Sequence, residues 1–231
     1  MAKNESFTGF SKDTIKFFER LRENNDRNWF EQHRDMYESS VLEPSRTFVL
    51  AMGARLRTIM PKIMAIPRVN KSLFRISRDT RFSQDKSPYK TNLGLYFWEG
   101  MRPRMECPGF YFHIEPPKMM LGCGSYVFPD RLLDRYRRAI VDPKRGKELA
   151  RIIEKMAGMK DWTLGGKHYK RIPPGFNPSH PNAPLLLHKG LYFMQETDIP
   201  EEFFSSHLVE YCFEKYAPFV PLHRWLVKVL F

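Results

Sequence analysis

The sequence predicts an α+β fold, with a mainly antiparallel sheet flanked by N-terminal and C-terminal helices in a single domain over residues 1–231. Apolar residues recur at helical spacing in the first third of the chain and again from about residue 129. The segment between them instead contains alternating and aromatic-rich runs, which are typical of strands. Neither an internal repeat nor a clear linker divides the chain, so one α+β domain is the simplest arrangement.

The first third of the sequence predicts three helices. Ser11 is a suitable N-cap for the first helix, which ends at the polar run "ENND". Asp26 is placed to cap a second helix that carries apolar and aromatic residues as far as Val41. Pro44 cannot lie deep inside a continuous helix but can begin one, so we expect a third helix over residues 44–60.

The middle of the chain predicts four strands. These are "KSLFRISR" (71–78), "TNLGLYFW" (91–98), "FYFHIE" (110–115) and "KMMLGCGSYVF" (118–128). The first alternates polar and apolar residues, and the next two are rich in aromatic side chains. Short connections between the later strands favour an antiparallel meander.

Helical patterns return in "PDRLLDRYRRAI" (129–140) and "KRGKELARIIEKMAG" (144–158), each with an apolar face opposite a cationic one. A proline-rich connector then precedes one more strand, "LLLHKGLYFMQ" (185–195). Residues 200–231 are again predicted to be helical.

The net charge of +12 is concentrated in two blocks. Residues 68–104 hold nine cations and three acids, a net +6, and residues 131–171 hold 13 cations and five acids, a net +8. Clustered cations favour an anionic partner such as a phosphate, a nucleic acid or an acidic lipid surface. The alternative is a basic surface with no specific partner.

The sequence predicts a cytoplasmic protein. The N-terminus has no apolar run after its lysine, as a signal peptide would, and the apolar stretches are shorter than the roughly 20 residues of a membrane span. We therefore expect no membrane partner. Three widely separated cysteines suit reduced thiols in the cytoplasm.

No standard catalytic or cofactor motif is present, so the sequence names no reaction, and no cofactor or metal is predicted. His113 and Glu115 would share one side of a strand. They could form an acid–base pair or ligate a metal, but a structural strand pair is the simpler interpretation.

The strongest candidate site is "RISRDTRFSQDKSPYKTN" (75–92). Arginine suits a bidentate grip on phosphate or carboxylate, and hydroxyl side chains in the same run add neutral donors. The alternative is that Asp79 and Asp85 hold two of these arginines in structural ion pairs. The candidate ligand-binding residues are Arg75, Arg78, Asp79, Arg81, Asp85, Lys86, Tyr89 and Lys90.

Two functions are consistent with the sequence, depending on whether the arginines of residues 75–92 bind a ligand or are held in structural ion pairs. The first is binding of an anionic or phosphorylated small molecule at residues 75–90, with or without catalysis. The second is a non-catalytic interaction module, in which basic helices over residues 130–157 dock a nucleic acid or an acidic protein partner. Aromatic residues beside the basic run also suit stacking on nucleic acid bases, although such residues are commonly core: Tyr96, Trp98, Tyr111 and Phe112.

The chain resembles an uncharacterised family, domain of unknown function 2461. The resemblance includes the run over 75–92, and also "FFERLRENNDRNWFEQHRDMYE" (17–38), "GCGSYVFPDRLLDRYRRAI" (122–140) and "KRIPPGFNPSHPNAPLLLHKGLY" (170–192). It implies one domain and no established activity. If the family's distinctive block is a site, the matching positions are the eight candidate residues above.

Overall fold

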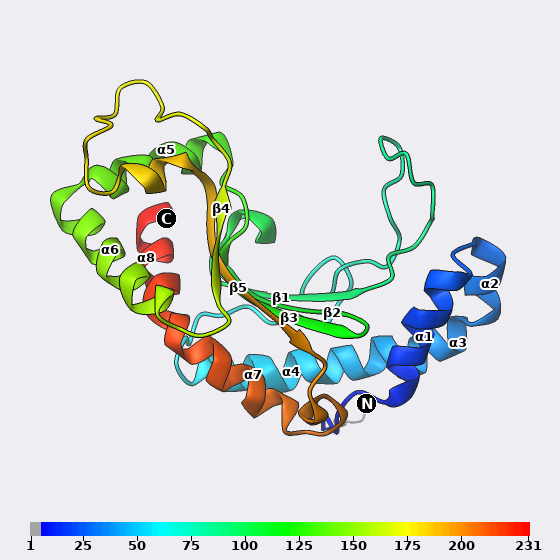
Figure 1. Cartoon of the computed structure of the whole chain (residues 1–231). Coiled ribbons are helices and arrows are strands. Elements are labelled where there is room, and N and C mark those ends of the chain that lie inside the picture. The colour runs from blue at the N-terminus through cyan, green and yellow to red at the C-terminus, as the bar shows by residue number, and fades with distance from the viewer. Residues whose placement is uncertain (1–5) are drawn as a thin grey trace. The chain divides into compact units, whose positions relative to one another are not determined.

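The computed structural model describes residues 6–231 and has the predicted α+β fold. Its five strands form one antiparallel sheet in the order β1-β2-β3-β5-β4, with helices at both ends of the chain (Figure 1). The contacts group the chain into two compact units. Unit 1 contains residues up to Phe97, Tyr111–Leu121 and Glu196–Lys215, and unit 2 contains Trp98–Phe110, Gly122–Gln195 and Tyr216–Phe231. That residues 1–231 form a single domain stays a prediction.

The helix caps predicted in the first third are present. Helix α1 (Lys12–Glu23) follows Ser11, whose backbone N–H donates to the Thr14 hydroxyl over 3.2 Å. Helix α2 (Arg27–Gln32) follows Asp26, whose carboxylate accepts from the backbone N–H of Trp29 over 3.0 Å. Both caps satisfy polar groups that the helix ends leave without an intrahelical partner.

The prediction of one uninterrupted second helix is wrong. His33 leaves helical geometry (φ −112°, ψ 16°), and its ring stacks on that of Trp29 with 4.0 Å between centroids. The chain continues as the short α3 (Arg34–Tyr37), the π-helix η1 (Glu38–Leu42) and α4 (Glu43–Arg57). Helical geometry continues without a break from α3 through η1 into α4, so the prediction that Pro44 begins a separate helix is wrong. The Ser40 carbonyl, four residues before Pro44, accepts from the Thr14 hydroxyl over 2.6 Å instead.

Four strands lie close to their predicted positions: β1 (Leu93–Trp98), β2 (Gly109–Glu115), β3 (Lys118–Ser125) and β5 (His188–Asp198). A fifth strand, β4 (Thr163–Lys167), was not predicted, and it pairs antiparallel with β5 in unit 2. Its sequence, TLGGK, has two glycines and no alternation. Gly166 has a φ of +98°, and a Cβ there would meet the backbone of Gly190, so this position requires glycine. A Cβ at Gly165 would meet the ring of Tyr192.

The prediction of a strand over residues 71–78 is also wrong. The segment makes two backbone bonds with β1, from Phe74 N–H to the Gly94 carbonyl (3.0 Å) and from Tyr96 N–H to the Ser72 carbonyl (2.8 Å). Beyond Phe74 it pairs with residues 88–90 of its own loop instead. The polar–apolar alternation therefore reflects an extended segment that divides its hydrogen bonds between two partners.

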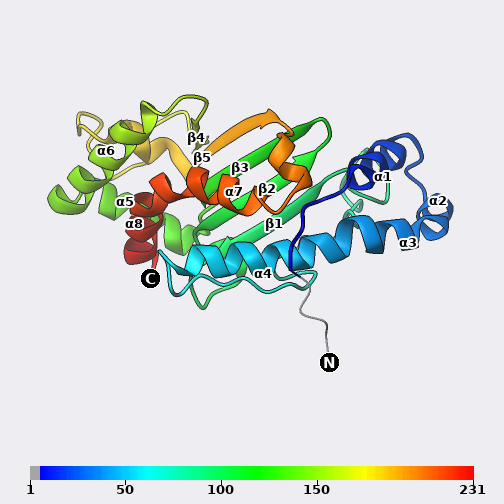
Figure 2. The same ribbon diagram turned by 90° about the horizontal axis from the view of Figure 1, so that it is seen from below.

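The core of unit 1 is aromatic. Phe48 on α4 is fully buried, and the centroid of its ring lies 4.9 Å from that of Phe112 on β2 and 5.1 Å from that of Phe7. The centroids of the Phe48 ring and the Phe97 ring of β1 are 6.4 Å apart. These contacts hold α4 against the sheet strands of its own unit, where Figure 2 shows it lying along β1.

Unit 2 encloses its own core between α5 (Asp130–Val141), α6 (Pro143–Ala157) and α8 (Val220–Leu230). Tyr136 and Trp225 are buried there, and each polar tip has a backbone acceptor. The Tyr136 hydroxyl donates to Leu185 (3.2 Å), and the Trp225 indole N–H donates to Arg145 (3.0 Å). Across residues 6–231, no helix combines the length and the apolar character needed to cross a membrane.

Replacing Phe48 by alanine is expected to destabilise the protein by about 3–5 kcal/mol, because a fully buried ring is removed and a cavity remains. Chemical denaturation followed by circular dichroism measures this change. Leu50→Ala is the matched control, since Leu50 lies on the same helix but is 49% exposed. Equal losses of stability in both variants would contradict this description of the core.

Candidate functional site

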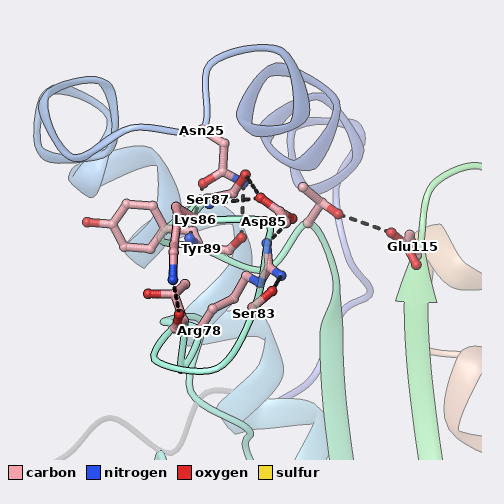
Figure 3. Close-up of polar contacts among 10 residues, drawn as sticks. Asn25, Arg78, Ser83, Asp85, Lys86, Ser87, Tyr89 and Glu115 are labelled. Atoms are coloured by element: carbon pink, nitrogen blue, oxygen red, sulfur yellow. Dashed lines mark hydrogen bonds and ion pairs between the residues drawn. The ribbon is translucent and has the colours of Figure 1, made fainter.

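A polar pocket of about 460 Å³ lies in unit 1 beside the segment singled out in the sequence. Its walls come from the α1–α2 turn, from the loop over residues 76–90 (the 76–90 loop), and from residues next to or at the ends of β1 and β2. Figure 3 shows several of these side chains. The lining residues are Arg22, Asn25, Arg78, Asp85, Ser87, Tyr89, Lys90, Thr91, Asn92 and Glu115.

The base of the 76–90 loop is closed by two backbone hydrogen bonds. The N–H of Arg78 donates to the Pro88 carbonyl, and the N–H of Lys90 donates to the Ile76 carbonyl, each over 2.8 Å. Ser77 and Tyr89 lie opposite each other in an isolated antiparallel bridge. The loop therefore begins and ends like a hairpin, which places Arg78 and Lys90 near each other although they are twelve residues apart.

Asn25 ties this loop to the α1–α2 turn. Its side-chain carbonyl accepts from the backbone N–H of Tyr89 over 3.0 Å, and its amide donates to the Tyr89 carbonyl over 2.9 Å. The Tyr89 ring stacks on Phe30 of α2, with centroids 4.1 Å apart and an interplanar angle of 19°. One residue of the loop is thus held through both its backbone and its side chain, as Figure 3 shows for the Asn25 contact.

Two ion pairs form within the loop, and both aspartates of the segment take part in them, as the structural interpretation of the sequence predicted. Arg78 pairs with Asp85 and also donates to the Ser83 hydroxyl over 3.5 Å. Arg81 makes a bidentate pair with Asp79, from Nε over 2.9 Å and from Nη2 over 2.7 Å. From the sequence, these ion pairs and a ligand site were alternatives, and both ion pairs are present in the structure.

Both aspartates have a lowered pKa. At Asp85 the main cause is the hydrogen bond from the Ser87 hydroxyl, followed by the Ser87 backbone N–H and the Arg78 guanidinium. At Asp79 the causes are the side-chain and backbone hydrogen bonds from Arg81. Because these contacts favour the charged form, both carboxylates are ionised at neutral pH.

Comparison with protein-family models matches residues 13–225 to a family described as conserved hypothetical protein, DUF2461. The match covers most of the chain. The chain belongs to this family. No curated protein matches the sequence, and the description of DUF2461 names no activity. The residues of the pocket are therefore the main evidence on function.

In this DUF2461 protein, four of the eight candidate residues line the pocket and four do not. Arg78, Asp85, Tyr89 and Lys90 are in the lining. Lys90 donates from Nζ to the Arg75 carbonyl over 3.0 Å, and Lys86 donates from Nζ to the Thr80 carbonyl over 3.0 Å. The candidates placed elsewhere on or beside the loop are Arg75, Asp79, Arg81 and Lys86.

Three residues that were not predicted also line the pocket: Arg22, Asn25 and Asn92. Arg22 is exposed on α1 and donates from Nη2 to the Pro116 carbonyl over 2.7 Å. The run "ENND" signalled the end of a helix, and it carried no sign that Asn25 holds a loop more than sixty residues away. Only the folded chain brings these residues to the pocket.

Glu115 joins the pocket to a row of polar side chains on β2. The Thr91 hydroxyl donates to Glu115 Oε1 over 3.0 Å, and the Tyr111 hydroxyl lies 2.9 Å from His113 Nδ1. His113 Nε2 and Glu115 Oε2 are 3.9 Å apart, which is too long for a hydrogen bond. The two residues share one side of β2, as predicted, but are not hydrogen-bonded to each other.

The interpretation of the aromatic strand residues as a surface for stacking bases is decided by the structure. Tyr96, Trp98 and Phe112 are buried, so they are core residues rather than a surface for stacking bases. Over the described residues 6–231, no group of three or more His, Cys, Asp or Glu side chains is placed to hold a metal ion.

Replacing Asn25 by alanine is expected to loosen the 76–90 loop, because two hydrogen bonds to Tyr89 are lost. The local free energy of opening should fall by about 1–3 kcal/mol. Hydrogen–deuterium exchange at the amides of Arg78 and Lys90 measures this change. Asn28→Ala on α2 is the matched control, and unchanged exchange in Asn25→Ala would contradict the role of Asn25.

The pKa of His113 is expected to lie below the usual value of about 6.5, because burial disfavours the imidazolium. The negative charges of Glu115 and Glu196 oppose this effect only in part. Between the lowered pKa and about 6.5 the unfolded chain binds the additional proton, so stability falls as the pH falls through this window. An NMR titration of His113 measures the pKa, and Glu115→Gln should lower it further. A His113 pKa above 6.5 would contradict this.

Proposed function

We propose that this protein binds a small molecule carrying a phosphate or another multivalent anion in the unit 1 pocket. The observation that carries the proposal is the convergence of three cations from separate segments on one cavity. Arg22 comes from α1, Arg78 from the start of the 76–90 loop and Lys90 from its end. Arginine and lysine together are the usual protein ligands of phosphate groups.

The charge of the lining supports an anionic ligand. Three cations face two carboxylates, Asp85 and Glu115, which leaves a net charge of +1. Neutral donors complete the wall through amide and hydroxyl groups of Asn25, Ser87, Thr91 and Asn92. A ligand with several oxygens suits this mixture of charged and neutral donors.

The Arg78–Asp85 pair supports binding by fixing the arginine in place. The Arg78 side chain is 26% exposed, so part of it stays accessible to a ligand. Asp85 is itself held by the hydroxyl and the backbone N–H of Ser87, over 2.6 and 2.9 Å. A guanidinium oriented beforehand loses less entropy when an anion binds.

The size of the pocket favours a small molecule over a polymer, because ligand pockets commonly measure about 300–1,000 Å³. Glu115 offers an acceptor for a hydroxyl of such a molecule, and His113 Nε2 lies 3.9 Å from its Oε2. An enzymatic role would use these two residues for proton transfer. The lining of the pocket supports binding of a ligand, and we propose binding without a catalytic step.

The alternative function, an interaction module with basic helices over 130–157, is less well supported. Arg131 pairs with Glu106 and Arg138 pairs with Asp134, while Arg135 donates to the Leu230 carbonyl over 3.0 Å. Several cations of this surface are therefore used within unit 2. We also propose that the protein acts in the cytoplasm, which suits its three buried, free cysteines.

Inorganic pyrophosphate is expected to bind the wild-type protein, and Arg22→Ala or Arg78→Ala should weaken binding about 10- to 150-fold. The reason is that each variant removes a charged donor from the pocket. Isothermal titration calorimetry measures the affinity. Arg81→Ala is the matched control, since Arg81 lies on the same loop, outside the lining, and pairs with Asp79.

Equal affinity of wild type, Arg22→Ala and Arg78→Ala would contradict the proposed pocket. So would an equal loss in Arg81→Ala, because binding would then follow the general charge of the loop. A thermal unfolding measurement on each variant checks that the fold is retained.

A further inference from the structure

Phe82 is the most exposed aromatic residue in the described part of the chain. Its side chain is 95% exposed, compared with 70% for Tyr126. It is also the only apolar side chain between Ile76 and Pro88. Burial within its own unit therefore does not explain its position.

A backbone turn at the tip of the 76–90 loop carries Phe82. The N–H of Ser83 donates to the Thr80 carbonyl over 3.3 Å, which closes a turn with Arg81 and Phe82 at its centre. Lys86 Nζ donates to the same carbonyl over 3.0 Å. The Arg81 guanidinium, held by Asp79, lies 5.8 Å from the Phe82 ring centroid.

The surroundings of this ring are cationic. Residues 68–97 of unit 1 contain seven cations and two acids, a net charge of +5. Lys86 is exposed beside the tip and keeps N–H donors in addition to the one that contacts Thr80. Arg75 is exposed at the base of the same loop, where its carbonyl accepts from Lys90. An exposed aromatic ring with cations beside it suits a polyanion that also presents flat, apolar faces.

We propose that the tip of the 76–90 loop binds single-stranded nucleic acid. Phe82 stacks on an unpaired base, Lys86 contacts a neighbouring phosphate, and Arg75 contacts a phosphate further along the same strand. Stacking on aromatic side chains and backbone contacts from cations are the two elements of such binding. Gln84 is exposed two residues after Phe82, and its side-chain amide supplies donors and an acceptor for base edges.

A nucleic acid fits this tip better than a lipid surface does. Phe82 is followed by Ser83 and Gln84, so a single ring would enter a bilayer together with polar neighbours. The gain from burying one ring is small compared with the cost of removing those groups from water. Stacking on one base requires only the ring itself.

The affinity of a fluorescently labelled single-stranded oligonucleotide, measured by anisotropy over a range of salt concentrations, tests the proposal. Phe82→Ala should weaken binding about 5- to 150-fold and leave the salt dependence unchanged, because stacking releases no counterions. Arg75→Gln should reduce the slope of log K against log salt by about 0.7, as expected for one phosphate contact to a single strand.

Two further variants make the result specific. Phe82→Trp keeps an aromatic ring and should bind as well as wild type, and the emission of the new tryptophan should be quenched by the oligonucleotide. Met101→Ala removes a fully exposed apolar side chain of unit 2 and should leave the affinity unchanged.

The proposal is overturned by equal affinity in wild type and Phe82→Ala, or by no binding of wild type at low salt. It is also overturned if Phe82→Ala weakens binding of anionic phospholipid vesicles or polyglutamate by the same factor. Phe82 does not line the unit 1 pocket, so Phe82→Ala should bind pyrophosphate like wild type. Failure of this proposal is therefore distinguishable from failure of the proposed pocket.

Discussion

The candidate site depends on the two hydrogen bonds between Asn25 and the backbone of Tyr89, at 2.9 and 3.0 Å. They fix one residue of the 76–90 loop against the α1–α2 turn, where the ring of Phe30 supports the Tyr89 side chain. Because Lys90 follows Tyr89 directly and Arg78 is bonded to Pro88, this single attachment also positions both cations. Without it, the pocket would lose the wall that carries most of its charge.

The ion pairs of the loop orient side chains more than they stabilise the fold. Arg81 and Asp79 have side chains 77% and 41% exposed, and exposed pairs of this kind contribute about 0–1 kcal/mol. Arg78 is better shielded and borders the pocket, so its pair with Asp85 acts where a ligand would bind. The loop thus divides its cations between those that shape it and those that face the pocket.

Local features of the fold were predictable from the sequence, whereas features that depend on distant contacts were not. The caps at Ser11 and Asp26 and the aromatic strands follow from neighbouring residues, and they were predicted. The glycine-rich β4 has no local strand signal, because its pairing with β5 requires close backbone approach instead of side-chain alternation. Half of the candidate residues reached the pocket, but Arg22 and Asn25 approach it from more than fifty residues away.

Folding alone does not account for the composition of the loop tip. An exposed pair such as Asp79–Arg81 adds little stability, and a 95% exposed Phe82 buries almost no apolar surface. A loop selected only for stability would lose nothing by carrying polar residues at these positions. A loop whose backbone turn presents one exposed ring gains from the same contacts, because a backbone ordered beforehand lowers the entropy lost when a partner binds. Stability alone therefore does not explain the residues of the tip, whereas the proposed binding of a partner would account for them.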